Sequence, residues 1–272
     1  MSHLAHVLLD ISNPDASLEL YTRRLGMRLK ATDVSSEPGA AIYSLSFVTG
    51  AMLRLRHRTA SKFVNARYRP RDSDAYWKIG VTVADVDVAR ERLLASGIEV
   101  TIANQFHDIG YLCHFDDPDG YCIELLQHAF QQNHSPRPLT DSEPLGTYPN
   151  LGQVSLNVTD IGNSLAFYRD RLGMKVLSRQ YVPERGFTLW FLGHPDLKPP
   201  ADSIDAIENR EWLWSLPETT LELRAYDRPT EPRRAHPPNE ELGFRGISLS
   251  SSAEPDRPLT DPDGVQVSIV GD

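Results

Sequence analysis

The sequence predicts an α+β fold made of four β-α-β-β-β units in two similar halves, with the last unit truncated. The first observation is a repeat, because residues 4–29 match residues 151–176 without a gap, including LGM at the end of each segment. The second is the turn DPDG, which begins at Asp117 and again at Asp261. The third is that each half opens with a strand pattern followed by a helix pattern.

These repeats divide the chain into two predicted domains of similar length. The first covers residues 1–128 and the second covers residues 147–272. Residues 129–146 are rich in proline and polar side chains, which is typical of a linker. A duplicated chain of this kind can fold as a monomer, and a homodimer is the alternative.

The first unit begins with an alternating strand. Val7, Leu9 and Ile11 lie on one face, and the polar His6 and Asp10 lie on the other. A helix follows, because Asn13-Pro14-Asp15 is a typical start signal and Gly26 a typical end. The apolar patterns at 40–48 and 51–58 predict two further strands.

The second unit repeats this order. A strand at 76–83 and a helix at 85–97 are followed by strands at 98–103, 111–115 and 121–127.

The second half keeps the scheme for one unit and then loses part of it. Val154, Leu156 and Val158 form the apolar stripe of its first strand, and an extra helix is expected at 205–216. Residues 250–260 have no helical period and contain two prolines, so the fourth unit is expected to lack its helix.

Charge and composition exclude several classes of protein. A net charge of -9 does not suit general nucleic-acid binding, which requires a basic face. No apolar run is long enough to span a membrane, and the first residues do not form a secretion signal. We therefore expect a cytoplasmic protein with no nucleic-acid or membrane partner, in which Cys113 and Cys122 are buried thiols rather than disulfide or metal ligands.

The motifs HVLLDI (6–11), FYRDRLGM (167–174) and DPDGYCIELL (117–126) together resemble those of the vicinal oxygen chelate superfamily. That superfamily includes glyoxalase I, extradiol dioxygenases and bleomycin resistance proteins, and the second half is most similar to glyoxalase I. The resemblance implies curved sheets that form cups, with a divalent metal ion (Fe, Zn, Ni, Mn or Mg) on the floor. Its ligands would come from the first and last strands of two facing units.

The resemblance places two candidate residues in each unit. Those able to bind a metal ion are His6, Glu124, Gln153 and Glu222. Arg54 and Lys78 are cations that would oppose a metal, Gly246 has no ligand side chain, and the hydroxyl of Ser268 is a poor ligand.

The pairing of the units decides which candidates meet, and the sequence leaves two arrangements open. If neighbouring units pair, one cup holds His6, Arg54, Lys78 and Glu124. If units one and four pair, the central cup holds Lys78, Glu124, Gln153 and Glu222.

The two cations also permit a cup that works without metal. Lys78 or Arg54 would stabilise a developing oxyanion, and Glu124 or His6 would act as the base, so these four are the predicted catalytic residues. The structural alternative is a buried salt bridge from Lys78 or Arg54 to Glu124. His114 lies on a predicted strand from which it could line the same cup, but an isolated strand histidine is more often structural, so a structural role is expected.

The predicted function is a small-molecule enzyme of the vicinal oxygen chelate type, a lyase, an isomerase or a dioxygenase-like enzyme. Its substrate would be a carbonyl or aromatic compound. The alternative is a non-catalytic or metal-free binding protein of the resistance type, which sequesters a small aromatic molecule. The basic run at 56–71 is expected to be a solvated loop that caps the cup.

Overall fold

The computed structural model describes residues 2–34, 39–59, 66–131, 143–228, 231–238, 241–251 and 258–271. Within these ranges the chain forms two curved mixed sheets. The first has the strand order β14(Leu259–Thr260)-β15(Gln266–Val270)-β13(Phe244–Ser250)-β1(His3–Ile11)-β4(Met52–Arg58)-β3(Ala40–Ser46)-β2(Arg28–Val34). The second has the order β10(Lys175–Val182)-β11(Phe187–Gly193)-β12(Thr220–Tyr226)-β9(Asn150–Val158)-β5(Tyr76–Val83)-β8(Cys122–Gln127)-β7(Gly110–Asp116)-β6(Asn104–Phe106).

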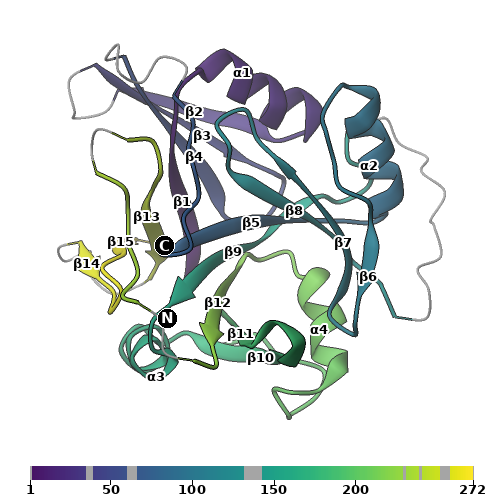
Figure 1. The fold of residues 1–272 in the computed structure, drawn as a ribbon, viewed down its shortest axis with the longest axis vertical. Helices are drawn as coiled ribbons and strands as arrows, with labels where there is room; N and C mark the ends of the chain where they lie inside the picture. The colour runs from purple at the N-terminus through teal and green to yellow at the C-terminus, as the bar shows by residue number, and fades with distance from the viewer. Residues whose placement is uncertain are drawn as a thin grey trace.

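Helices follow the first strands of units one to three: α1(Pro14–Leu18) with the π-helical turn η1(Glu19–Arg24), α2(Val86–Ala95), and α3(Ile161–Leu165) with the π-helical turn η3(Ala166–Arg171). The 3₁₀ turn η4(Pro183–Arg185) joins β10 to β11, and α4(Ile207–Trp214) lies between β11 and β12. In Figure 1, β5 and β9 cross the middle of the molecule, with α1 and α2 above them and α3 and α4 below. No helix in these ranges is long and apolar enough to cross a membrane.

The sheet order settles how the units pair. β1 of unit one pairs antiparallel with β13 of unit four, and β5 of unit two pairs antiparallel with β9 of unit three. Units one and four therefore share the first sheet, and units two and three share the second. The arrangement in which neighbouring units pair is wrong for this chain. Each sheet contains strands of both predicted domains. The domain boundaries themselves, 1–128 and 147–272, stay a prediction.

The predicted fold class is confirmed, and the expected helices in the first three units form. One predicted strand is wrong, because residues 98–103 are irregular and the strand begins only at Asn104. Most of the segment in which unit four was expected to lose its helix, residues 252–257, lies outside the described residues. Cys113 and Cys122 are both free; Cys113 is buried as expected, whereas Cys122 is only partly buried.

The core lies between the helix-facing sides of the sheets. Val7, Leu9 and Ile11 of β1 are fully buried in one cluster that also contains Val81 of β5 and Val154 of β9. This burial turns the polar stripes of the same strands toward the opposite, concave faces, because successive side chains alternate along a strand.

The two DPDG turns have a structural role. The Asp117 carboxylate accepts hydrogen bonds from the backbone of Asp119 and Tyr121, both at 2.9 Å, and from the Tyr21 hydroxyl at 2.8 Å. In unit four, the Asp261 carboxylate accepts the equivalent hydrogen bond from the Tyr168 hydroxyl at 2.8 Å. The repeated tyrosine and the repeated turn are thus two sides of one contact, which docks the helix of one unit on the turn of the next.

Candidate functional site

Four strands of the second sheet bring four of the predicted residues together. Lys78 lies on β5, Glu124 on β8, Gln153 on β9 and Glu222 on β12. Gly80 pairs with Gln153 on one side and with Glu124 on the other, and a side chain at Gly80 would overlap Gln153, whose Cγ lies 2.5 Å from a built Cβ. The absence of a side chain at position 80 therefore lets Gln153 extend across β5 toward Glu124.

The four side chains form one buried hydrogen-bonded network. The Lys78 Nζ donates to Glu124 Oε1 at 2.5 Å, and Gln153 Nε2 donates to Glu124 Oε2 at 2.9 Å. Gln153 Nε2 also reaches Glu222 Oε2 at 3.1 Å, and the Ser155 hydroxyl donates to that same oxygen. Lys78, Glu124, Gln153 and Glu222 are each at most 4% exposed.

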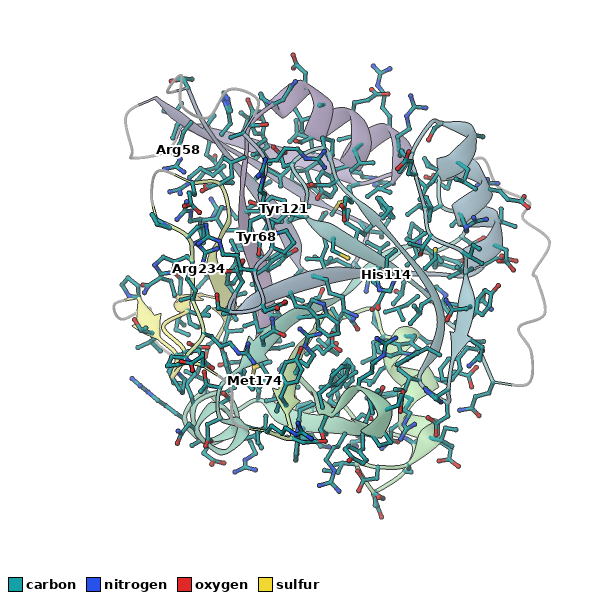
Figure 2. All side chains as sticks on the ribbon, in the orientation of Figure 1. Arg58, Tyr68, His114, Tyr121, Met174 and Arg234 are labelled. Carbon is teal, nitrogen blue, oxygen red and sulfur yellow. The ribbon has the colours of Figure 1, made fainter. Side chains whose placement is uncertain are left out.

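His114 joins this network, although the sequence analysis treated it as a structural residue. It lies on β7 directly opposite Glu124 in the β7–β8 hairpin, and its Nε2 is 2.9 Å from Glu124 Oε1. The register of this hairpin follows from the DPDG turn, so the turn was a signal that could have placed His114 beside Glu124. Figure 2 shows His114 right of the centre of the molecule, on β7.

The two carboxyl groups are held in different electrostatic states. Burial raises the pKa of Glu124, but the Lys78 ammonium and His114 more than offset this and hold the pKa well below its usual range. Burial raises the pKa of Glu222, and the negative charge of Glu124 raises it further. Burial lowers the pKa of Lys78, yet Glu124 and Glu222 raise it above its usual value, so Lys78 stays an ammonium.

A cavity of about 360 Å³ opens above this polar floor. Its walls are largely aromatic and aliphatic, formed by Trp77, Phe106, Ile109, Leu112, Leu126, Phe187, Leu189, Phe191 and Trp214. Asn104, Arg185 and Arg224 complete the lining. The cavity therefore suits a ligand with an apolar body, one polar end on the floor and another polar group near the arginines.

Arg224 is a partly buried cation in the cavity wall. Its guanidinium lies 3.6 Å from the centre of the Trp77 ring, and its Nε donates to Asn157 Oδ1 at 2.6 Å. No carboxylate of the described residues lies within ion-pair distance of it, and burial lowers its pKa. A partly buried guanidinium without a direct ion-pair partner favours an anionic group on the ligand.

His6 and Arg54 lie elsewhere, on β1 and β4 of the first sheet. The pairing of β1 with β4 brings them close, and burial together with the Arg54 charge lowers the pKa of His6 to about 4. Of the two arrangements left open by the sequence, the cup of His6, Arg54, Lys78 and Glu124 is therefore wrong, because His6 and Arg54 lie on the first sheet and Lys78 and Glu124 on the second. No salt bridge joins Arg54 to Glu124; in the described part of the chain its nearest acidic oxygen is Asp33 Oδ2 at 4.0 Å.

Gly246 and Ser268 belong to the same first sheet. Gly246 pairs with Leu8 of β1, and Ser268 pairs with Ser248, which itself pairs with His6. His6 thus has no second metal-binding side chain among these positions.

The central network does not fit a divalent metal ion held in the way the resemblance implies. One of its four ligand positions carries the Lys78 ammonium, which is bonded to Glu124 and repels a second cation. Gln153 directs its amide N–H, not its oxygen, at both carboxylates. Within the described ranges, no three His, Cys, Asp or Glu side chains are grouped as metal ligands.

Comparison with known proteins agrees with this architecture. Glyoxalase I of Saccharomyces cerevisiae is 24% identical over 76% of this chain and 67% of its own length. An iron-dependent extradiol dioxygenase of Rhodococcus jostii is 27% identical over 58% of this chain and 56% of its own length. The crystal structure of glyoxalase I from Zea mays superposes with a TM-score of 0.70 at 20% identity, over 100% of this chain and 92% of that one, which shows a shared fold.

A family model also matches most of the chain. It is the model of the glyoxalase/bleomycin resistance protein/dioxygenase superfamily, and it covers residues 3–125 and 150–254. The resemblance inferred from the three sequence motifs is confirmed. The chain therefore belongs to the glyoxalase/bleomycin resistance protein/dioxygenase superfamily.

Proposed function

We propose that this protein is a lyase or isomerase that removes a proton beside the carbonyl group of a small anionic, aromatic compound, without a metal ion. The observation that carries the proposal is the Lys78 ammonium on the cavity floor, 2.5 Å from Glu124 in one of the four ligand positions. An ammonium has three N–H donors, and Glu124 is the one acceptor seen for it among the described residues. Its remaining donors are available to a substrate oxygen.

Lys78 would stabilise the negative charge that develops on the carbonyl oxygen when the neighbouring proton leaves. A preformed charge in a dry site is effective for this purpose, because it requires no reorganisation during the reaction. Glu124 stays ionised and keeps the ammonium in place. It is a poor base, since its pKa is held low by Lys78 and His114.

Glu222 is the better candidate for the base, although Glu124 and His6 were expected to act as bases. Its raised pKa makes its carboxylate the stronger proton acceptor of the two, and it lines the same cavity. In the proposed step the C–H bond breaks, its proton moves to Glu222, and the electron pair forms an enolate beside Lys78. Return of the proton to a different atom gives an isomerase, and loss of a leaving group gives a lyase.

The cavity walls and Arg224 define the substrate class. Trp77, Phe187 and Trp214 match a flat apolar body, and the guanidinium of Arg224 matches a carboxylate. Phenylpyruvate combines an aromatic ring, a carbonyl group and a carboxylate, so it is a suitable probe. The probe represents the class and is not itself assigned as the substrate.

The test measures, by NMR in D₂O, the rate at which the protons beside the carbonyl group of phenylpyruvate exchange for deuterium. We expect Lys78→Gln and Glu222→Gln each to lower kcat about 100-fold or more, since each removes a charge that acts on the transition state. Arg224→Gln should mainly raise KM. His6→Ala, on the first sheet, is the matched control and should keep the wild-type rate.

The metal question is tested on the same samples. We expect plasma mass spectrometry to find well under one metal ion per chain, and incubation with EDTA to leave the exchange rate unchanged. One bound metal per chain that is lost in Glu124→Ala and Glu222→Ala, together with loss of activity in EDTA, would show that the site is a metal centre. A full exchange rate in Lys78→Gln would also overturn the proposal.

A second candidate is a binding protein that sequesters a small aromatic anion. It is favoured by the extent of the aromatic wall and by the saturation of Glu124 with three hydrogen-bonding partners. Tight binding of phenylpyruvate that is lost in Arg224→Gln, with no catalysed exchange, would support this candidate over the enzyme.

A further inference from the structure

We propose that the protein has a second ligand site, an arginine-lined pocket that binds the phosphate group of a small molecule. The pocket has a volume of about 240 Å³ and is lined by Ala66, Arg67, Tyr68, Arg69, Arg71, Arg234, Glu241 and Leu242. None of these residues lines the aromatic cavity. In Figure 2, Tyr68 and Arg234 lie on the left of the view and His114 on the right.

The pocket corrects one expectation from the sequence. The basic run 56–71 was expected to be a solvated loop that caps the cup. Residues 60–65 of this run lie outside the described part of the chain. Residues 66–71 form a largely exposed loop, as expected, but its arginines line this separate pocket and not the aromatic cavity. Arg56 and Arg58 belong to β4.

Positive charge in the pocket exceeds the available carboxylates. Arg234 pairs with the buried Asp74 at 2.7 Å, and Arg71 and Arg234 share Glu241, each at 3.4 Å. Arg67 and Arg69 have no carboxylate within 4.0 Å in the described ranges. Two guanidinium groups therefore face the pocket region without a counter-charge.

The backbone that carries Arg67 and Arg69 is firmly anchored. Tyr68 stands between them, is 5% exposed, and stacks on Tyr121 with ring centres 4.7 Å apart. Its hydroxyl donates to Asp74 Oδ2 at 2.8 Å, and its backbone N–H donates to the Asp119 carbonyl at 2.7 Å. Binding of an anion between the two arginines would thus require little ordering of the main chain, which favours affinity.

A second arginine cluster adds to the positive field. The carboxylate of the fully buried Asp10 forms ion pairs with the guanidinium groups of three arginines: Arg56 at 2.7 Å, Arg58 at 3.0 Å and Arg245 at 2.5 Å. Arg58 and Arg245 also donate to the carbonyl of Glu241, whose side chain lines the pocket. This concentration of arginine in a chain of net charge -9 creates a local positive potential that attracts anions.

A purely structural role explains only part of the cluster. Arg234 exchanges backbone hydrogen bonds with Ser73 at 2.7 Å and Ala75 at 2.9 Å, so with Asp74 it ties the segment around 231–238 to the first half. Arg71 assists through Glu241. Arg67 and Arg69 take no part in these contacts, and they are the residues that a ligand would use.

Phosphate is the ligand chemistry that matches this arrangement. The guanidinium group presents paired N–H donors that fit two phosphate oxygens. A phosphate monoester carries a charge of about -1.5 to -2 at neutral pH, which balances two unpaired arginines. A pocket of 240 Å³ encloses one small molecule and not a nucleic-acid strand.

Isothermal titration calorimetry at constant ionic strength tests the site, with inorganic phosphate, pyrophosphate and glycerol phosphate as probes. We expect saturable binding of at least one probe to wild type, weakened about tenfold or more in Arg67→Gln/Arg69→Gln. Arg23→Gln/Arg24→Gln is the matched control and should bind as wild type does. It removes the same charge from an exposed turn, where both arginines pair with Glu19 in the described part of the chain.

Circular dichroism should show that both double variants remain folded. Binding of inorganic phosphate as strong as that of glycerol phosphate would identify free phosphate as the ligand. Stronger binding of glycerol phosphate would identify a phosphorylated small molecule. Absence of saturable binding by all three probes, or equal weakening in the two double variants, would overturn the proposal.

Discussion

At the cavity floor, Glu124 and Glu222 lie in electrostatic environments that shift their pKa values in opposite directions. Glu124 contacts Lys78, His114 and Gln153, which stabilise its ionised form. Glu222 is equally buried, but its direct partners are the neutral Ser155 and Gln153. Pairs of carboxyl groups whose pKa values are pushed apart are typical of sites that use one as a fixed charge and the other for proton transfer.

Asp117 shows how a buried carboxyl group in the DPDG turn affects stability. Burial and the neighbouring Asp119 raise its pKa from about 4 to about 7, although three hydrogen bonds oppose the change. The folded state therefore binds a proton that the unfolded state has lost between these two values. The contribution of Asp117 to stability is fully present below about pH 4 and is lost as the pH rises through about 7.

We predict that Asp117→Asn reduces this loss. Asparagine keeps the side-chain oxygen for the backbone N–H groups but carries no charge to bury. Relative to wild type, the free energy of unfolding of the variant should rise between pH 4 and pH 8 by about 4 kcal/mol, since each unit of pKa difference corresponds to about 1.4 kcal/mol. Urea unfolding at several pH values measures this difference. A difference that does not change with pH would show that Asp117 is ionised in the folded protein throughout.

At the scale of elements, the strand patterns predicted β5, β7, β8 and β9 of the second sheet. They failed at residues 98–103, where an apparent strand is irregular. There Thr101 makes two contacts with His114, one through its backbone N–H at 2.9 Å and one through its hydroxyl at 2.8 Å. When a side-chain hydroxyl replaces a backbone carbonyl as the acceptor, the regular ladder of hydrogen bonds between two strands is interrupted. The alternation of apolar and polar residues in the sequence does not reveal such an interruption.

Gly80 controls the contact between β5 and β9 at the site. A Cβ at this position would lie 2.5 Å from Cγ and 2.8 Å from Cδ of Gln153. We predict that Gly80→Ala displaces the Gln153 side chain, breaks its hydrogen bonds to both glutamates, and destabilises the protein by about 1–3 kcal/mol. It should also lower the rate of phenylpyruvate exchange.

A double-mutant cycle provides the control. Because Gln153→Ala removes the atoms that clash, Gly80→Ala should cost much less in the Gln153→Ala background than in wild type. Urea unfolding of the four proteins gives the coupling energy. Additive effects of the two changes would mean that Gly80 is required for another reason.

At the scale of the whole molecule, the two halves depend on each other for their sheets. The central pairs β1–β13 and β5–β9 each join a strand of the first half to a strand of the second. The Tyr21–Asp117 and Tyr168–Asp261 contacts then link neighbouring units within each half, across the two sheets. The two halves that are similar in sequence are therefore not two independently folded domains, because each sheet contains strands of both halves.

We predict that neither half is a folded monomer by itself. Residues 1–128 and 147–272, produced separately, would leave β1, β5, β9 and β13 with unpaired edges. Each should lack a cooperative thermal transition, and mixing or co-expression should give a 1:1 complex with the ellipticity of the intact chain. Analytical ultracentrifugation and circular dichroism measure this. A monomeric half that unfolds cooperatively would contradict the prediction.

The sequence by itself determined the repeated units, the helices of the first three units, the superfamily and the candidate residues from which the network is drawn, because periodicity and repeated motifs are local properties of the chain. It could not decide whether Lys78 and Glu124 meet His6 and Arg54 or Gln153 and Glu222. That choice depends on which first strands pair, a contact between distant segments. Tertiary structure also decided the role of His114, the exposure of the arginine pocket and the divergent pKa values of two glutamates, since burial and charge proximity exist only in the folded chain.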